Sequence, residues 1–250
     1  MSTSGSILVG LATYNELLNL PSLVEAIHAE LPEAGVLVVD DNSPDGTGRW
    51  CQEFSTGHSW LEVISRPEKM GLGTALALLM QSAIERGVTH LVTLDADWSH
   101  PPARLQAMLL QAVDSDVVIG SRYCPGGQIS GWPWQRRFTS RCINTLSRLI
   151  MGLPIRDCSG NFRIYRTAIL EKVRWENLNS PGYAFIEEIL WELKLAGARF
   201  AEVPILFTDR KAGDSKLSFS EIAGAGRMIA GLVKKRLSSF SHSPNPNALG

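Results

Sequence analysis

Long apolar runs are absent from this sequence, since nowhere do about 18 apolar residues, the length of a membrane-spanning helix, follow one another. The first residues carry neither a basic region nor a long apolar stretch, so no secretory signal is visible. We therefore expect a cytoplasmic protein whose contact with a membrane, where there is one, is peripheral and on the cytoplasmic face.

Cysteine is scarce, and no two of the four cysteines have the C-x-x-C spacing typical of zinc sites. Their scatter also argues against a disulfide framework and indicates a reducing compartment. The cysteines are Cys51, Cys124, Cys142 and Cys158.

An excess of either charge is missing too, because 24 Lys and Arg face 25 Asp and Glu, for a net charge of −1. This balance, and the absence of any RNA- or DNA-binding signature, excludes nucleic acid as an expected partner. A basic site in this chain has to be local. The 250 residues are 44% hydrophobic and 20% charged, which excludes disorder and suits an α/β core.

Short β-type runs alternate with helical patterns through the first half, which is typical of a mostly parallel sheet flanked by helices. Strands are predicted at Ile7–Ala12, Val36–Asp40, Leu61–Ser65, His90–Leu94 and Val117–Gly120. Helices are predicted at Glu16–Glu30, Gly46–Phe54, Gly73–Arg86 and Pro102–Ala112.

The second half begins with a Gly-, Pro- and Trp-rich segment and a basic helix. Further elements are predicted as helices at Gln135–Met151 and Phe185–Ala196, strands at Asp157–Tyr165 and Phe200–Phe207, and an amphipathic helix over Phe219–Leu237. The last helix carries Lys234, Lys235 and Arg236, which suit either a cationic helix end packed on the core or a membrane surface.

Two carboxylates one residue apart, Asp95 and Asp97, follow the strand that ends at Leu94. Alternate residues share a face, so both can point into a crevice at the end of the strand. Oxygen ligands of this kind suit Mg²⁺ or Mn²⁺ bridging to a diphosphate. The alternative is a turn in which Asp97 caps the next helix. His100 is interpreted as a surface or capping residue, not a base.

A second acidic group, Asp40 and Asp41, follows another strand and suggests recognition of a base or ribose at the same crevice. Capping by Asp45 is the alternative for its neighbours. Arg66 and Lys69, close to Gly71 and Gly73, can meet a phosphate or an acidic partner.

Arginines near tryptophans in the second half predict an anionic ligand with an apolar part. Of the adjacent Glu187 and Glu188, one is expected to face the crevice and the other to face solvent.

Taken together, these motifs and their order resemble family 2 glycosyltransferases of the GT-A fold, and within them the dolichyl- or polyprenyl-phosphate mannosyltransferase branch. The resemblance spans roughly Ile7 to Leu217. The matching segments are 13–16, 40–47, 66, 69–73, 95–101, 120–123, 157–160, 162–163, 202–205, 207–210 and 213–216.

The resemblance implies one GT-A nucleotide-diphospho-sugar transferase domain over residues 1–237 and a disordered tail over 238–250. Residues 1–120 would form its nucleotide-binding half and residues 121–237 its acceptor-binding half. Transmembrane segments found after this region in many relatives are missing here. Lipid access would therefore come from the 132–141 region, the basic helix ending at Leu237 or a membrane partner.

The same resemblance implies the site. Donor-binding residues would be Tyr14, Glu16, Val39, Asp41, Lys69, Asp95, Ala96, Asp97, Arg122, Arg210 and Lys216. The metal, Mg²⁺ or Mn²⁺, would be held by Asp95, Asp97 and Ser99, the last standing where the family often has Gln. Acceptor phosphate would lie near Arg136 and Ser140, and the catalytic residues would be Asp97, Arg122 and Arg210.

The implied reaction is an inverting transfer of mannose from GDP-mannose to a dolichyl or polyprenyl phosphate. A lipid phosphate is already an anionic nucleophile, so the site needs alignment and stabilisation of the leaving diphosphate more than a general base. Alternatives are a related transferase that uses a UDP-sugar, with a polyprenyl-phosphate or a soluble acceptor, and a catalytically silent protein that binds nucleotide sugars.

Overall fold

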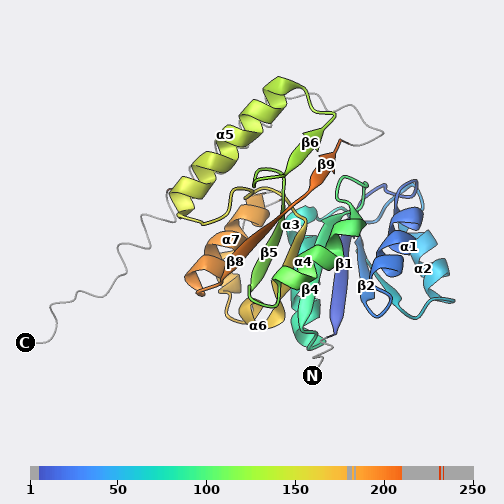
Figure 1. Ribbon diagram of the computed structural model, residues 1–250. Helices are drawn as coiled ribbons and strands as arrows, with labels where there is room; N and C mark the ends of the chain where they lie inside the picture. Colours follow the sequence, from blue (N-terminus) through green and yellow to red (C-terminus); the bar gives the residue numbers. More distant parts are fainter. Residues whose placement is uncertain (1–5, 179–181, 183, 210–230, 232, 234–250) are drawn as a thin grey trace, which may run out of the picture.

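The computed structural model describes residues 6–178, 182, 184–209, 231 and 233. A mixed sheet of seven strands, in the order β3-β2-β1-β4-β7-β5-β8, runs through its centre (Figure 1). All neighbours pair in parallel except β7, which is antiparallel to both β4 and β5. The strands are β1 (Ile7–Thr13), β2 (Gly35–Asp40), β3 (Leu61–Ser65), β4 (His90–Asp95), β5 (Val117–Ser121), β7 (Arg163–Arg166) and β8 (Phe200–Pro204). The expected mostly parallel α/β fold is confirmed.

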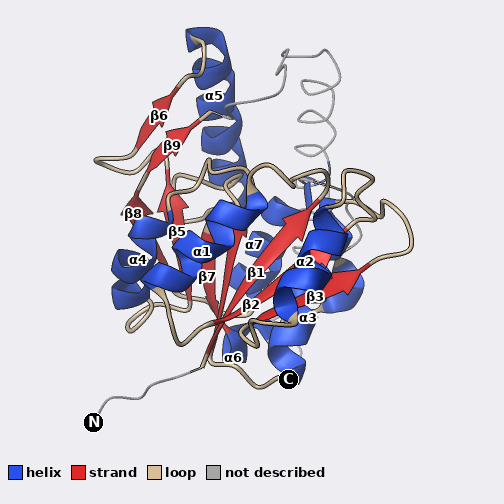
Figure 2. Cartoon of the chain, turned by 90° about the vertical axis from the view of Figure 1, so that its right-hand side faces the viewer, coloured by secondary structure: helices blue, strands red, loops and turns tan. Residues whose placement is uncertain are grey.

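Helices cover both faces of the sheet (Figure 2). One apolar cluster joins one face to α1 (Leu20–Glu30), α2 (Thr47–Ser55) and α4 (Leu105–Gln111), which follows a 3₁₀ turn at Pro102–Arg104. The other cluster joins the opposite face to α3 (Leu72–Glu85), α6 (Thr167–Leu170) and α7 (Ala184–Leu195). A second 3₁₀ turn, Trp175–Asn177, precedes α7. Successive apolar residues of a strand join alternate clusters, because each face of the sheet has its own helical layer.

Two elements of the sheet and its helical layers begin later than the sequence predicts. The helix expected from Glu16 begins only at Leu20, because Asn15 has a left-handed backbone (φ 61°) and Pro21 suits a first helical turn. A strand over Asp157–Tyr165 was wrong in its first part, since β7 begins at Arg163. There the Asp157 Oδ1 atom accepts a hydrogen bond from the Gly160 N–H at 3.0 Å and closes a turn instead.

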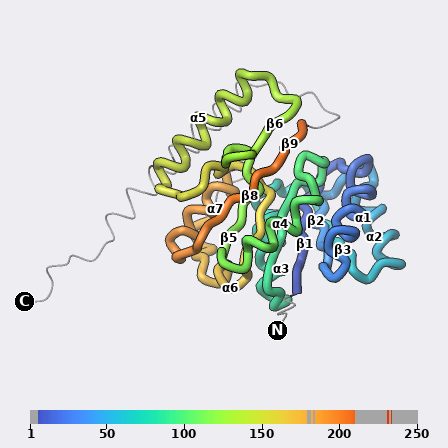
Figure 3. The backbone as a smooth tube through the Cα atoms, in the orientation of Figure 1, coloured from blue at the N-terminus to red at the C-terminus, as the bar shows by residue number. Residues whose placement is uncertain are grey.

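A small parallel ribbon and a long helix lie beyond the carboxyl ends of β5 and β8 (Figure 1). The ribbon pairs β6 (Gln128–Ser130) with β9 (Leu206–Thr208), which are far apart in sequence but adjacent in the trace (Figure 3). The strand predicted at Phe200–Phe207 is therefore two strands, and the chain passes at Ile205 from the main sheet to the ribbon. The predicted basic helix is α5 (Trp134–Met151), which ends on Gly152 in a left-handed conformation.

Several expectations fall outside the described residues: Arg210, Lys216, the tail 238–250 and nearly all of the helix predicted at Phe219–Leu237. Among the helices that the structure does describe, none is both long and apolar enough to cross a bilayer.

Candidate functional site

The carboxyl ends of β1, β2 and β4 meet at one edge of the sheet. In the parallel register, Thr13 lies opposite Asp40, and Ala12 lies opposite Asp95. The two acidic groups predicted from sequence therefore stand at the ends of β2 and β4, the two strands that flank β1. In open α/β sheets this edge is where ligands bind.

The acidic pair after β2 is held by the protein itself. Asp40 is buried and accepts hydrogen bonds from the Thr13 hydroxyl at 3.0 Å and from the Ser43 N–H at 3.0 Å. Asp41 forms an ion pair with Arg66 and accepts the Gly71 N–H at 2.8 Å. Arg66 thus meets an acidic partner, one of the two roles expected of it. These bonds tie the loop before α3 to the end of β2.

The predicted nucleoside side of the site differs in exposure from residue to residue. Tyr14 is exposed, and the Lys69 Nζ atom lies 3.7 Å from the centre of its ring. The Glu16 carboxylate accepts a hydrogen bond from the Asn19 amide at 2.9 Å. Val39 is fully buried in the sheet, so it presents no exposed surface to a ligand.

Asp95 and Asp97 are fixed in different ways at the end of β4. The Asp95 Oδ1 atom accepts a hydrogen bond from the Asn161 amide at 3.0 Å, and the Asp97 Oδ1 atom accepts the Ser99 N–H at 3.1 Å. Between them Ala96 is buried, and Trp98 has a left-handed backbone (φ 64°), which bulky residues rarely adopt. Strain of this kind persists where the surroundings hold a particular geometry.

His100 is buried beneath these carboxylates, so the expectation of a surface position was wrong. Its Nδ1 atom accepts the Asp95 backbone N–H at 3.0 Å, which requires that nitrogen to be unprotonated. Burial lowers the pKa of His100, outweighing the carboxylates of Asp95 and Asp97 that act in the opposite direction. A neutral His100 therefore supports the backbone at the end of β4.

The donor set fits a divalent cation that shares its coordination with a ligand. Ser99 is buried, and its hydroxyl has no hydrogen-bond partner in the described part of the chain. That oxygen and the carboxylates of Asp95 and Asp97 are hard ligands of the type Mg²⁺ and Mn²⁺ prefer. The described residues contain no cluster of three or more His, Cys, Asp or Glu suited to a metal. Such an ion would need further oxygens from its ligand, as Mg²⁺ usually does at diphosphates.

Arg122 lies at the end of β5 in a buried ion pair with Asp157. Its Nε and Nη2 atoms donate to the two Asp157 oxygens at 2.7 and 2.6 Å, and Nη2 also donates to the Ser159 hydroxyl at 2.8 Å. Burial alone acts to lower the pKa of Arg122, but the Asp157 carboxylate raises it above its usual range. Burial likewise acts to raise the pKa of Asp157, and Arg122 lowers it below its usual range. Both groups are charged.

The predicted acceptor residues lie at the start of α5. Arg136 stacks on the Trp132 ring, with its guanidinium carbon 4.1 Å from the ring centre, and lies 3.5 Å from the Asp209 carboxylate. The Ser140 hydroxyl accepts a hydrogen bond from the Tyr123 hydroxyl at 2.6 Å. Tyr123 contacts both Arg122 and Ser140, and Trp132 contacts both Arg122 and Arg136. Arg136 and Ser140 therefore lie on the same side of the site as Arg122.

Some contacts and some burial in this region were not predicted from the sequence. Asp157 was part of a resembling segment and Asn161 was not, and nothing in the sequence indicated that these residues bind Arg122 and Asp95. Glu187 and Glu188 are both buried, so the expectation that one faces solvent was wrong. Burial raises the pKa of Glu187 to about 8, with Arg163 opposing and Asp157 adding to that shift.

Comparison with known proteins identifies the family of this chain. The family model described as glycosyl transferase family 2 matches residues 8–174. The chain belongs to this family of glycosyltransferases. It is 42% identical over 226 residues to a polyprenol monophosphomannose synthase of Mycolicibacterium smegmatis, covering 89% of this chain and 85% of the relative. It is 37% identical to an undecaprenyl-phosphate mannosyltransferase of Micrococcus luteus, covering 85% and 87%.

Solved structures share the fold at lower identity. A glucosyl-3-phosphoglycerate synthase of Mycobacterium tuberculosis, crystallised with Mn²⁺, UDP and phosphoglyceric acid, superposes with a TM-score of 0.65 at 18% identity, covering 93% of this chain and 78% of that one. A structure of that synthase with Mg²⁺ and UDP gives 0.62. The family 2 glycosyltransferase described here thus has the GT-A fold, with Asp95 and Asp97 at the end of its fourth strand.

Proposed function

We propose that this glycosyltransferase moves mannose from GDP-mannose to a polyprenyl or dolichyl phosphate with inversion at the anomeric carbon. The observation that carries the proposal is the arrangement of Asp95, Asp97 and the buried Ser99 hydroxyl on the strand edge where Asp41 and Arg66 fix the neighbouring loop. The polyprenyl-phosphate mannosyltransferases among its relatives supply the substrate class.

On the donor side, Asp95, Asp97 and Ser99 would hold Mg²⁺ or Mn²⁺. The bound ion would offset the negative charge that gathers on the leaving diphosphate. Tyr14 and Glu16 would border the nucleoside. Lys69, which the Tyr14 ring holds in place, is a further donor contact, as are Arg210 and Lys216.

Two of the proposed donor-binding residues, Asp41 and Arg122, already form ion pairs within the protein. Because Asp41 is paired with Arg66, its proposed role is to shape the wall of the nucleoside pocket as well as to bind the nucleoside. The ion pair with Asp157 keeps Arg122 charged. The N–H groups of Arg122 that Asp157 does not accept can donate to a phosphate.

On the acceptor side, Arg136 and Ser140 would bind the phosphate of the lipid. That phosphate is anionic near neutral pH, so its oxygen can attack the anomeric carbon without a general base. The residues of the chain then contribute alignment and charge stabilisation. Protonated carboxylic acids are not required for any step.

Access to a lipid acceptor implies contact with a membrane surface, which we propose to be peripheral. Exposed aromatic side chains lie among arginines on α5, next to the proposed acceptor residues. Such a helix suits an interfacial position on an anionic bilayer.

The test is incubation of the purified chain with radiolabelled GDP-mannose, polyprenyl phosphate and Mn²⁺, followed by organic extraction. We expect label in the organic phase, and none when EDTA is present. A parallel reaction with UDP-glucose tests the alternative donor, and label from that reaction alone would overturn GDP-mannose.

Asp97→Asn tests the role of the proposed metal ligands. Because it removes one anionic ligand without changing the side-chain shape, we expect transfer to fall by about a hundredfold or more with the fold intact. Asp114→Asn, at an exposed carboxylate far from this edge, is the matched control. Equal transfer by the Asp97 and Asp114 variants would contradict the assignment.

A further inference from the structure

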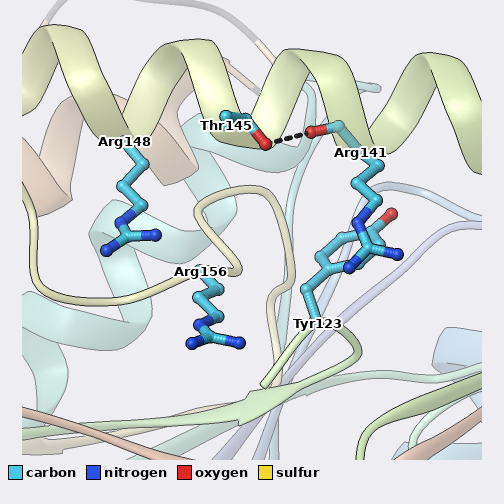
Figure 4. A pocket seen from close by; sticks show the side chains of 5 residues that line it. All are labelled: Tyr123, Arg141, Thr145, Arg148 and Arg156. Carbon is cyan, nitrogen blue, oxygen red and sulfur yellow. Dashed lines mark hydrogen bonds between the residues drawn. The ribbon is translucent and has the colours of Figure 1, made fainter. Parts of the chain in front are cut away.

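A second basic site lies under α5, next to the residues proposed for the acceptor but not lined by them. A cavity of about 150 Å³ is bounded by α5 above and by the loop that follows it (Figure 4). Its lining residues are Tyr123, Arg141, Thr145, Arg148 and Arg156. The three members from α5 are spaced four and three residues apart, so they share one face of the helix.

The charged residues that line this cavity are all arginines. Among the ion pairs of the described residues, none includes Arg141, Arg148 or Arg156. Two carboxylates lie close by in the chain, but Asp157 is paired with Arg122, and Glu202 accepts the backbone N–H groups of Arg156 and Asp157. The three guanidinium groups therefore share a cavity without an anionic partner among the residues that the structure describes.

Hydroxyl groups in the cavity are already used as donors. Tyr123 donates its hydroxyl to Ser140 at 2.6 Å, and Thr145 donates its hydroxyl to the Arg141 carbonyl at 2.7 Å. Arg148 makes a long contact of 3.4 Å from its Nε atom to the Leu153 carbonyl. What the cavity offers to a ligand is guanidinium N–H groups, in the planar fork that matches phosphate oxygens.

We propose that this arginine cavity binds a phosphate-type oxyanion, separately from the acceptor phosphate expected at Arg136 and Ser140. Neither of those two residues lines the cavity. The oxyanion could be the phosphate of a lipid headgroup or free phosphate in solution, because both present the same oxygens. The inference does not depend on the transfer reaction.

Titration calorimetry with inorganic phosphate tests the site directly. The variant is Arg148→Gln with Arg156→Gln, and the matched control is Arg49→Gln with Arg104→Gln, two exposed arginines away from α5 that remove the same charge. Each lost charge-assisted contact is a large share of the affinity for so small an ion, so we expect at least about tenfold weaker binding in the variant. The control should stay within about twofold of the unaltered chain.

Arg156→Gln alone guards against a folding defect, because the only hydrogen bond that the structure gives Arg156 as a donor comes from its backbone. It should weaken phosphate binding in the same direction and keep the same melting temperature. Binding of GDP with Mn²⁺, measured alongside, should be unchanged in every variant. A loss of GDP binding in the double variant would show that its effect is not local to this cavity, and would overturn the proposal.

Sedimentation with phosphatidylcholine vesicles that contain phosphatidic acid distinguishes the two sources of phosphate. If the double variant loses vesicle binding and the control keeps it, the ligand is a lipid headgroup. If only calorimetry separates them, the ligand is free phosphate. Should the double variant equal the unaltered chain in both measurements, or should the control lose binding equally, the proposal is overturned.

Discussion

Arg122 and Asp157 form an ion pair that is almost completely removed from water, with Asp157 fully buried and Arg122 8% exposed. The Asp157 carboxylate also accepts the backbone N–H groups of Arg122 and Gly160. A pair of this kind contributes less through its attraction than it would cost if one partner were removed, because the remaining charge would stay buried. The same contacts place a permanent cation beside the proposed acceptor residues.

Asp157→Asn should therefore destabilise the chain by about 3–5 kcal/mol in urea unfolding, because it leaves the Arg122 guanidinium buried without its counter-charge. The double change Arg122→Met with Asp157→Leu should cost less than the sum of its single changes, since it removes both charges. Glu62→Gln breaks the more exposed pair with Arg86 and should cost less than about 1 kcal/mol. Additive single and double changes would contradict a coupled pair.

Glu187 makes the stability of the fold depend on pH. Burial raises its pKa to about 8 from an ordinary value of 4.5, so the folded state binds a proton that the unfolded state has lost between these values. Stability must then fall as pH rises through that window. We expect a loss of about 2 kcal/mol between pH 6 and pH 8, measured by urea unfolding, and a smaller loss in Glu187→Gln.

Glu25→Gln, at an exposed carboxylate of α1, is the control for this measurement. It should leave the slope of stability against pH unchanged. A Glu187→Gln protein with the unaltered slope would show that Glu187 titrates normally in the folded chain.

The helix α5 exposes large aromatic side chains and also carries several arginines. Trp134 is 71% exposed and Phe138 is 64% exposed, and the helix carries four arginines and no acidic residue. The residues that α5 buries are Asn144, Ser147 and Met151, toward its end. Large apolar side chains that stay in water next to cations are typical of helices that lie at a bilayer surface.

Replacing Trp134 and Phe138 together with Ser should weaken binding to anionic vesicles on the order of tenfold, since burying each aromatic ring in the interface is favourable. The control is Leu110→Ser, an equally exposed apolar residue (72%) on α4, which Figure 1 shows well apart from α5. Sedimentation measures both. Raising the salt concentration should also release the unaltered chain, because the arginines act through screened charge. Equal loss in the Leu110 variant would make the effect one of general hydrophobicity.

The elements of the first half could be predicted from sequence because each carries its own signal. The strand predicted at Val36–Asp40, for example, contains the continuous apolar run Val36–Val39, and the structure keeps the predicted bounds of such strands within a residue or so. Features that depend on contacts between residues far apart in the sequence had no such signal. The placement of β7 and the burial of His100 and Glu188 depend on which strands and helices meet, which local periodicity does not contain.

At the scale of the whole molecule, the two halves share one sheet. The strand β7 comes late in the chain but lies between β4 and β5, pairing His90 with Arg166 and Val117 with Tyr165. The strand β5 has no other neighbours in the main sheet than β7 and β8, both of which come later in the chain. The proposed donor half therefore lacks the strands that would join its own β4 and β5.

We accordingly expect residues 1–120 alone not to reach a stable fold, although they contain every residue proposed to bind the nucleoside and the metal. In that fragment the β4 edge and both edges of β5 would expose unpaired backbone groups and the apolar faces that α7 covers. Circular dichroism and calorimetry should show no cooperative melting for the fragment and a cooperative transition for the full chain. A fragment that melts cooperatively and binds GDP with Mn²⁺ would mean that the donor half is a domain in its own right.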